Sequence, residues 1–384
     1  MNTVTYSELG LPQRSHPRPV ELQQENYLEL YDSNTLFYDV FIKNNKLIFL
    51  GPPIDENIVD EIILNIFIDE ISLVKHRYKL YKSNKVYKLI VDIKALSKVR
   101  VFGRQLDNFT TELDGFNRNK ILFTVQKNND VEWIKYWVKW HVRHHGVDGV
   151  IIFDNDSNLY SIDSLYSSIK NIAPLVKVIS MKFLYGPGAY LGSSWDSDYF
   201  QYFALEYVRY TCDSGDAKLI NTDIDELIVN KSAFSVFEEL DSNHSFVFLK
   251  GNWVDVKESS SFFRKNLAHD SHEILNLKET CANKWVAQLK NIPDNVFLQV
   301  HSHFGKLKGV KNTSHSYFLH FRSISTNWKW NRVREVKFSS LEHELIDITN
   351  YPSIHILSNF QKLNLKIKIT SKYLKLKQKW SFFK

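Results

Sequence analysis

Apolar and polar positions between residues 119 and 157 follow a strand, helix and strand pattern. The mostly apolar run Ile121–Val125 predicts a short buried strand. Apolar-face side chains then recur at helical spacing and predict an amphipathic helix: Trp133, Ile134, Trp137, Val138 and His141. Asn129 or Asp130 would cap the start of this helix, Gly146 would end it, and residues 149–153 predict a second buried strand. This order predicts two parallel strands joined by a right-handed crossover, and therefore an α/β fold.

The first third of the chain has a different pattern, with short apolar runs separated by polar turns. Residues 35–50 predict a β-hairpin, although its turn lacks glycine. Residues 86–93 and 98–102 predict two further strands, whereas residues 58–74 fit a helix and a strand equally well. We therefore expect residues 1–118 to form a mostly β module and a connector to the next domain.

Two acidic segments follow predicted strands further along the chain. Asp154-Asn155-Asp156-Ser157 comes directly after the second strand, at the carboxyl end where open α/β sheets bind ligands. Asp223-Ile224-Asp225-Glu226 closes the apolar run 217–222. On one extended strand, carboxylates at i and i+2 point to the same side and can hold one hard divalent cation. An isolated D-x-D triplet is weak evidence for a metal, and its position after a strand strengthens that evidence.

Taken in order, these motifs also resemble a known family. The chain has a strand ending near Asn128, a helix beginning Glu132-Trp133-Ile134, the turn Gly146-Val147-Asp148, and a strand closing on Asp-Asn-x-Ser. This set resembles the nucleotide-sugar domain of family 92 glycosyltransferases and their relatives in family 2. In those families a later strand ends in Asp-x-Asp-Glu-Phe, often after Ala-Lys-Trp. This chain has Leu219 and Leu227 in place of the Trp and the Phe, so it keeps the carboxylates. The resemblance covers about residues 119–325.

The resemblance implies a GT-A domain over residues 119–350, with a Rossmann-like mixed sheet flanked by helices. It implies a nucleotide-diphosphate donor, in the first place a UDP-sugar, with Mn²⁺ or Mg²⁺ on the diphosphate. In this reading Asp154 contacts the nucleotide. The full set of residues that we expect to contact the nucleotide sugar is Gln126, Asn128, Asp154, Asp223 and Arg322.

The same resemblance implies a metal site made of the acidic triplet and a late histidine. Asp223 and Asp225 would hold the ion, directly or through water. His301 matches the expected histidine best by position, and His303 and His320 are the alternatives. Two carboxylates with one imidazole suit Mn²⁺ better than Zn²⁺, which favours nitrogen and sulfur ligands.

Sugar transfer to an acceptor hydroxyl requires a general base. Asp255 and Glu258 are the candidates, and Glu226 would either face the donor sugar or support the loop. The family resemblance implies inversion at the anomeric carbon. The Lys-, Asn- and Ile-rich composition is typical of AT-rich bacterial genomes, so we expect a glycan or lipid-linked glycan acceptor in surface polysaccharide or lipopolysaccharide synthesis.

Positive charge is concentrated towards the C-terminal end of the chain. The 384 residues carry a formal net charge of +6 at pH 7, and residues 359–384 contain eight lysines and no acid. These lysines lie among apolar and aromatic residues, which suits peripheral contact of segment 351–384 with an anionic membrane. A final strand and helix with a solvated lysine face is the alternative. The rest of the chain has no basic patch, so we expect no nucleic-acid partner.

Cysteine content and hydropathy bear on localisation. The chain has only Cys212 and Cys281, which excludes a disulfide framework and a cysteine-based metal site. The first 20 residues lack an apolar signal region, and no stretch approaches 18 uninterrupted apolar residues. We therefore expect a cytoplasmic protein, peripheral on the inner face of the cell membrane if the C-terminal segment binds lipid.

Two other functions would use the same residues. A non-catalytic sugar- or nucleotide-binding scaffold in polysaccharide assembly would need no divalent metal. A metal-dependent phosphohydrolase would use the carboxylate pair and release free sugar or phosphate regardless of acceptor. The ordered set of motifs favours sugar transfer over both.

Overall fold

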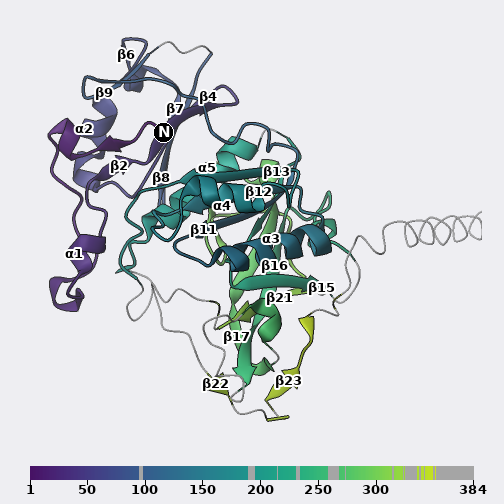
Figure 1. The fold of residues 1–384 in the computed structure, drawn as a ribbon. Coiled ribbons are helices and arrows are strands. Elements are labelled where there is room, and N and C mark those ends of the chain that lie inside the picture. The colour runs from purple at the N-terminus through teal and green to yellow at the C-terminus, as the bar shows by residue number, and fades with distance from the viewer. Residues whose placement is uncertain are drawn as a thin grey trace, which may run out of the picture.

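The computed structural model describes residues 1–94, 98–188, 195–213, 215–230, 234–257, 268–272, 274–313, 315–322, 324, 335–336, 339–340, 342–348 and 351. Within them the chain forms a mixed α/β protein, with one large mixed sheet and several small antiparallel sheets in the N-terminal part (Figure 1). Glu258 and, apart from Tyr351, the basic segment 351–384 lie outside the described residues.

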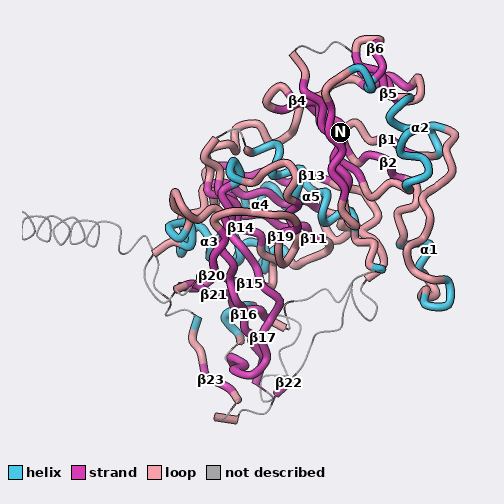
Figure 2. Tube along the Cα trace, turned by 180° about the vertical axis from the view of Figure 1, so that it is seen from behind, coloured by secondary structure: helices cyan, strands magenta, loops and turns pink. Residues whose placement is uncertain are grey.

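The large sheet has the spatial order β13, β12, β11, β14, β17, β16, β21 and β15. Its first four strands are parallel to one another: β13 (Leu175–Ser180), β12 (Gly149–Asp154), β11 (Lys120–Gln126) and β14 (Lys218–Asn221). The remaining strands on this path are β17 (Ile274–Gln288), β16 (Phe246–Lys257), β21 (Ser316–Phe321) and β15 (Glu226–Asn230). Strand β17 is antiparallel to both of its neighbours, and the long strands β16 and β17 extend well beyond the parallel part (Figure 2). Three short strands pair with these two: β20 (Val310–Asn312), β22 (Glu335–Val336) and β23 (His343–Leu345).

The order of the parallel strands creates a topological switch point. From β11 the chain crosses to β12 and then to β13 on one side, and it returns past β11 to β14 on the other side. The predicted parallel pairing of the first two strands is confirmed, since β11 and β12 pair along their whole length. Because the chain leaves β11 towards β12 and comes back from β13 to β14 on the other side of β11, a crevice is expected at the carboxyl ends of β11 and β14, where open α/β sheets bind ligands.

Three helices cover the two faces of the parallel strands. Leu122 of β11 belongs to one core cluster with α3 (Val131–His145) and α4 (Ile162–Ile169), whereas Phe123 belongs to another with α5 (Tyr199–Cys212). This division follows from the period of two along a strand. The predicted caps of α3 are confirmed: the Asp130 side chain accepts from the Glu132 backbone N–H, and Gly146 has φ 67°. None of the helices in the described part of the chain combines the length and apolar character that a bilayer crossing requires.

Two four-stranded antiparallel sheets make up most of the N-terminal part. One has the order β3 (Asp39–Lys43), β4 (Lys46–Gly51), β8 (Tyr87–Asp92) and β7 (Tyr78–Lys82). The other has the order β10 (Arg104–Leu106), β9 (Val99–Val101), β5 (Ile66–Ile68) and β6 (Ile71–Ser72), and β1 (Val4–Thr5) pairs with β2 (Thr35–Phe37). The helices here are short, α1 (Tyr27–Leu30) and α2 (Val59–Leu64). The ambiguous stretch 58–74 therefore contains both a helix and strands, and the mostly β prediction for this part is confirmed.

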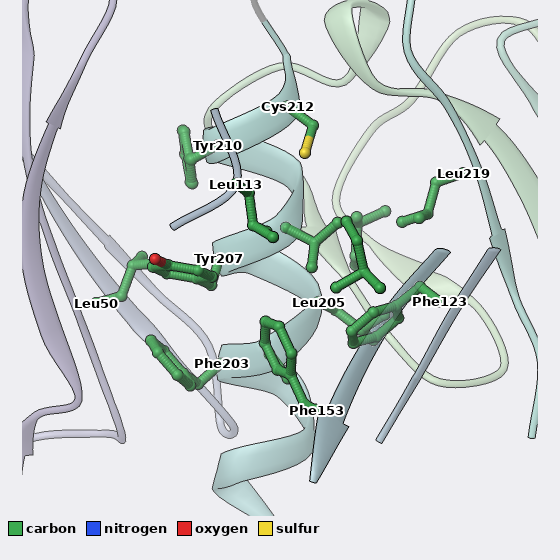
Figure 3. Close-up of a cluster of buried hydrophobic side chains, with 14 of the residues drawn as sticks. Leu50, Leu113, Phe123, Phe153, Phe203, Leu205, Tyr207, Tyr210, Cys212 and Leu219 are labelled. Atoms are coloured by element: carbon green, nitrogen blue, oxygen red, sulfur yellow. The ribbon is translucent and has the colours of Figure 1, made fainter. Parts of the chain in front are cut away.

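Helix α5 lies between the N-terminal strands and the large sheet (Figure 3). Leu50 of β4 belongs to the same buried cluster as Phe203 and Tyr207 of α5, and so do Phe123 and Phe153 of the large sheet. One hydrophobic core therefore spans both sides of the predicted boundary near residue 118. The N-terminal sheet is thereby held directly against the element that supports the switch point.

Candidate metal centre

Both acidic segments lie at the same edge of the large sheet. Strand β11 ends at Gln126, and β12 ends at Asp154, its partner in the parallel ladder. Strand β14, on the other side of β11, ends at Asn221 just before the second acidic segment. Segments 154–157 and 223–226 are therefore brought to the carboxyl ends of strands around the switch point.

Residues 223–226 form a tight turn between β14 and β15, and the expectation that two aspartates share one side of an extended strand is wrong. The Glu226 backbone N–H donates to the Asp223 carbonyl oxygen at 3.0 Å. The Glu226 carboxylate in turn accepts from the Asp223 backbone N–H at 2.9 Å. Aspartate is favoured at the first position of such a turn, so the strand ends at Asn221 and the chain reverses. The turn places Asp225 and Glu226 next to each other at the sheet edge.

Asp225, Glu226 and His320 form the group of described residues that is arranged to hold a metal ion. Glu226 begins β15, and His320 lies directly opposite it on β21. The His320 Nε2 atom is 3.1 Å from Asp225 Oδ2, and its Nδ1 atom is 3.6 Å from Glu226 Oε1. One ligand atom from each residue lies within 4.8 Å of the others. The side chains are 12%, 2% and 8% exposed, so the group is largely shielded from water.

Lys284 of β17 is buried beside this group. Its side chain is 0% exposed, and its Nζ atom is 2.7 Å from Asp223 Oδ2 and 3.1 Å from Glu226 Oε2. Burial opposes the charged form of Lys284, but the two carboxylates outweigh burial and raise its pKa. Burial also opposes ionisation of Asp223, but Lys284 outweighs it and lowers the pKa of that carboxyl. Burial raises the pKa of Glu226 to about 6, against the opposing effect of Lys284.

The charge of this cluster suits a divalent cation. Asp223, Asp225 and Glu226 bring three carboxylates together, and Lys284 pairs with two of them, Asp223 and Glu226. Carboxylates gathered in a poorly hydrated place are costly unless cations balance their charge, so a divalent ion beside Asp225 and Glu226 would be stabilised there. Oxygen ligands suit Mg²⁺ and Mn²⁺, and the single imidazole favours Mn²⁺ of these two. The donor set therefore fits the predicted ion.

The structure does not bring the predicted ligands Asp223 and His301 into this group. The Asp223 carboxylate is paired with Lys284 and is 38% exposed. His301 is exposed in a turn, where its Nδ1 atom lies 2.9 Å from the Asn283 carbonyl oxygen. His303 begins β19 (His303–Phe304), opposite β18 (Phe297–Leu298), and its ring packs against Phe246. His301 therefore lies in the turn of a β-hairpin and His303 on its second strand, and the histidine of the group is the alternative His320.

The first acidic segment forms a closed hydrogen-bonded loop. Asp154 and Gln126 are buried and bond to each other through the Gln126 Nε2 and Asp154 Oδ2 atoms. The other Asp154 oxygen accepts from the Ser157 backbone N–H at 2.9 Å, and the Ser157 hydroxyl accepts from the Asn128 backbone N–H at 2.8 Å. Tyr160 donates to Gln126 Oε1 at 3.0 Å. The residues predicted to contact the nucleotide therefore shape the loop beside the switch point, and their side chains already form hydrogen bonds within it.

Arg322 and Asp255 form an ion pair next to the metal group. The Arg322 Nε atom is 2.8 Å from Asp255 Oδ1, and its guanidinium also pairs with Glu279. Asp255 is fully buried, which does not suit the predicted role of a base that meets an acceptor. Trp253 stacks on His320 with ring centroids 3.9 Å apart, and the Arg322 guanidinium lies 4.1 Å from the Trp253 ring centroid. Arg322 and Trp253 therefore hold the metal-group histidine in place, and the predicted phosphate contact of Arg322 competes with two carboxylates.

His320 and Lys284 contribute more to this site than the local sequence pattern indicates. Both residues lie within strands, and local sequence patterns do not show which strands pair with each other. Glu226, for example, lies opposite His320 in a ladder that joins residues about 90 positions apart. The one local signal was an isolated histidine at the end of the apolar run Tyr317–Leu319. For Lys284, a lysine inside the buried run of β17 is unusual, because lysine is almost never fully buried unless it is paired.

Comparison with known proteins adds no family. No protein-family model matches the chain, and no curated protein matches it with significant similarity.

Proposed function

We propose that the protein is a metal-dependent glycosyltransferase of the GT-A type. It would move a sugar from a nucleotide-diphosphate donor, in the first place a UDP-sugar, to a glycan acceptor. The proposal rests on one observation: Asp225, Glu226 and His320 meet beside the topological switch point of the sheet. Ligands of open α/β sheets bind at that point, and this donor set suits the ion that a diphosphate requires.

In this transfer a bond forms between an acceptor oxygen and the anomeric carbon of the sugar. The bond from that carbon to the diphosphate breaks, the diphosphate leaves with the electron pair, and the acceptor proton passes to a base. When bound, a divalent ion would neutralise charge on the departing diphosphate. Asp255 does not suit the role of this base, because it is paired with Arg322.

The residues of this chain would divide the remaining tasks. Asp225, Glu226 and His320 would hold the ion, and Lys284, paired with Asp223 and Glu226, opposes the rise that burial causes in the pKa of the Glu226 carboxyl. The loop around Asp154 would present its backbone to the nucleotide, since its side chains are used to shape it.

Metal-dependent binding of UDP tests the proposal without an identified acceptor. At a ligand concentration 100 times its Kd, binding to the folded state adds about 2.7 kcal/mol to stability, which raises the unfolding temperature by several degrees. We expect UDP to raise the unfolding temperature only when Mn²⁺ is present. The Asp225→Asn variant should lose this effect and keep its circular dichroism spectrum.

The matched control is Asp60→Asn, which removes an exposed carboxylate from α2 in the N-terminal part. It should retain the full effect of UDP and Mn²⁺. Stabilisation by UDP in the presence of EDTA, equal to that with Mn²⁺, would contradict the metal-dependent proposal and favour the scaffold function. Release of phosphate or free sugar at the same rate with and without any acceptor glycan would favour the phosphohydrolase.

A further inference from the structure

His269 is a buried histidine that contacts the acidic turn from a distant part of the chain. It lies in the described segment 268–272, and its side chain is 0% exposed. Its Nε2 atom is 2.8 Å from the carbonyl oxygen of Ile224. Ile224 stands between Asp223 and Asp225, so this hydrogen bond holds the middle peptide group of the turn.

The direction of this hydrogen bond defines the state of the His269 ring. A carbonyl oxygen can only accept, so Nε2 carries the proton and donates. The Nδ1 atom is buried and has no hydrogen-bond partner among the described residues. Burial lowers the pKa of His269 to about 4, which keeps the ring neutral at physiological pH. The His269 ring is therefore neutral, and its N–H group donates a hydrogen bond to the Ile224 carbonyl oxygen.

Packing fixes the orientation of this ring. Tyr136 of α3 stacks on it with ring centroids 5.0 Å apart and an interplanar angle of 9°. Phe321 of β21 meets it edge-on at 5.1 Å, and the Phe321 backbone N–H donates to the Asp225 carbonyl oxygen at 2.8 Å. The carbonyl oxygens of Asp223, Ile224 and Asp225 are thus all hydrogen-bonded, and the bond to Ile224 comes from the His269 side chain.

We propose that His269 is a positioning residue for the metal centre. By holding the Ile224 carbonyl, it fixes the peptide that leads into Asp225 and so directs the Asp225 carboxylate towards His320. Hydrogen-bond partners that orient metal ligands in this way typically change metal affinity by about 10- to 100-fold when they are removed. This inference rests on the proposed function, because it assumes that Asp225, Glu226 and His320 bind the ion.

Mn²⁺ titration of three variants tests the inference, with free Mn²⁺ measured by electron paramagnetic resonance at pH 7.5. His269→Ala should weaken Mn²⁺ binding by about 10- to 100-fold. His269→Gln keeps an N–H donor of similar reach and should restore affinity to within about 3-fold of the wild type, a rescue that a purely packing role would not give. Circular dichroism confirms that each variant is folded.

The matched control is His272→Ala, which removes another buried imidazole from the same segment. His272 also packs edge-on against Phe321, at 5.2 Å, but its ring bonds to Ala268 of its own segment and not to the turn. Its removal should leave Mn²⁺ affinity unchanged. Equal affinity of His269→Ala and the wild type, equal weakening in His269→Gln, or an equal loss in His272→Ala would overturn the positioning role. Failure of the wild-type protein to bind Mn²⁺ would instead overturn the proposed metal centre itself.

Discussion

Lys284 supplies a buried positive charge to the acidic turn. It has no access to water and offers its charge to Asp223 and Glu226 at hydrogen-bond distance. A buried charge that loses its partner is strongly destabilising, whereas a complete pair is close to neutral in its net effect. The charge balance of the centre therefore depends on Lys284 and on the proposed divalent ion together.

Replacing this lysine should reveal that dependence. Lys284→Met should lower the free energy of unfolding by about 3–5 kcal/mol, because two carboxylates then lack their buried cation. Saturating Mn²⁺ should recover part of the loss, since a divalent ion supplies the missing charge. Urea denaturation with and without Mn²⁺ measures both effects.

Lys290→Met is the control for that experiment. Lys290 makes a surface ion pair with Asp216, and both side chains are about half exposed or more. Surface pairs contribute about 0–1 kcal/mol, so this variant should change stability little and show no added response to Mn²⁺. A loss below 1 kcal/mol in Lys284→Met would show that the carboxylates do not need the buried charge.

At the scale of elements, local chemistry explains the parts of the fold that the sequence predicted. The β3–β4 hairpin turns on Asn44 and Asn45, with φ of 51° and 58° and with Lys43 paired to Lys46. Two positive φ values are what a tight hairpin turn requires, and asparagine tolerates them better than other residues with a side chain. The hairpin could thus be predicted although its turn has no glycine. The caps of α3, Asp130 and Gly146, could also be predicted from local residues.

The turn offers a direct test of this account. Asn45→Gly should raise the free energy of unfolding by several tenths to about 1 kcal/mol, because glycine adopts a positive φ without steric cost. Asn45→Val should lower it by roughly 1–2 kcal/mol, the cost of a left-handed conformation for a bulky side chain. Urea denaturation compares the two. Equal stability of the two variants would contradict a left-handed backbone at residue 45.

Other elements could not be predicted from their own residues. The sequence of the acidic triplet is compatible with an extended strand and with a turn. Hydrogen bonds from Glu226 and Phe321 stabilise the turn. His301 and His303 follow an apolar run, but His301 lies in the turn of the β18–β19 hairpin and His303 on its second strand. Each of these outcomes depends on strand pairings that join distant segments, which local patterns do not contain.

Across the whole molecule, a buried charge network joins strand β8 of the N-terminal part to helix α5, which packs against the large sheet. Lys88 of β8 and Arg209 of α5 both pair with Glu206, at 3.1 Å and 2.8 Å, and all three side chains are at most 1% exposed. Glu206 also accepts from the Leu298 backbone N–H at 2.6 Å. The sequence suggested a mostly β module and connector over residues 1–118, and local patterns do not contain this network or the shared core, because both depend on tertiary contacts.

Glu206→Gln should therefore destabilise the whole protein, because the buried Lys88 loses the carboxylate that stabilises its charge, and Arg209 keeps the longer, 3.8 Å ion pair with Asp294. We expect a loss of about 3–5 kcal/mol at pH 7. Burial lowers the pKa of Lys88 to about 7, below its unfolded value of 10.5, so the folded state binds fewer protons than the unfolded state between these pH values. Stability from this group therefore rises as the pH increases from 7 to 10, and more so without Glu206.

The difference between wild type and Glu206→Gln should consequently shrink between pH 7 and pH 10 in urea denaturation. Lys88→Met should cost less than Glu206→Gln, since Glu206 keeps Arg209 as its partner. A gap between Glu206→Gln and wild type that widens with rising pH would contradict the buried-cation explanation.

The position of a bound ion tests the central claim most directly. A crystal structure of the protein with Mn²⁺ and UDP, with anomalous scattering recorded at the manganese edge, would locate the ion without ambiguity. We predict one strong anomalous peak coordinated by Asp225, Glu226 and His320, with the UDP diphosphate bound to the same ion. A structure in which both manganese and UDP occupy another part of the molecule, and these three side chains bind neither, would contradict the account.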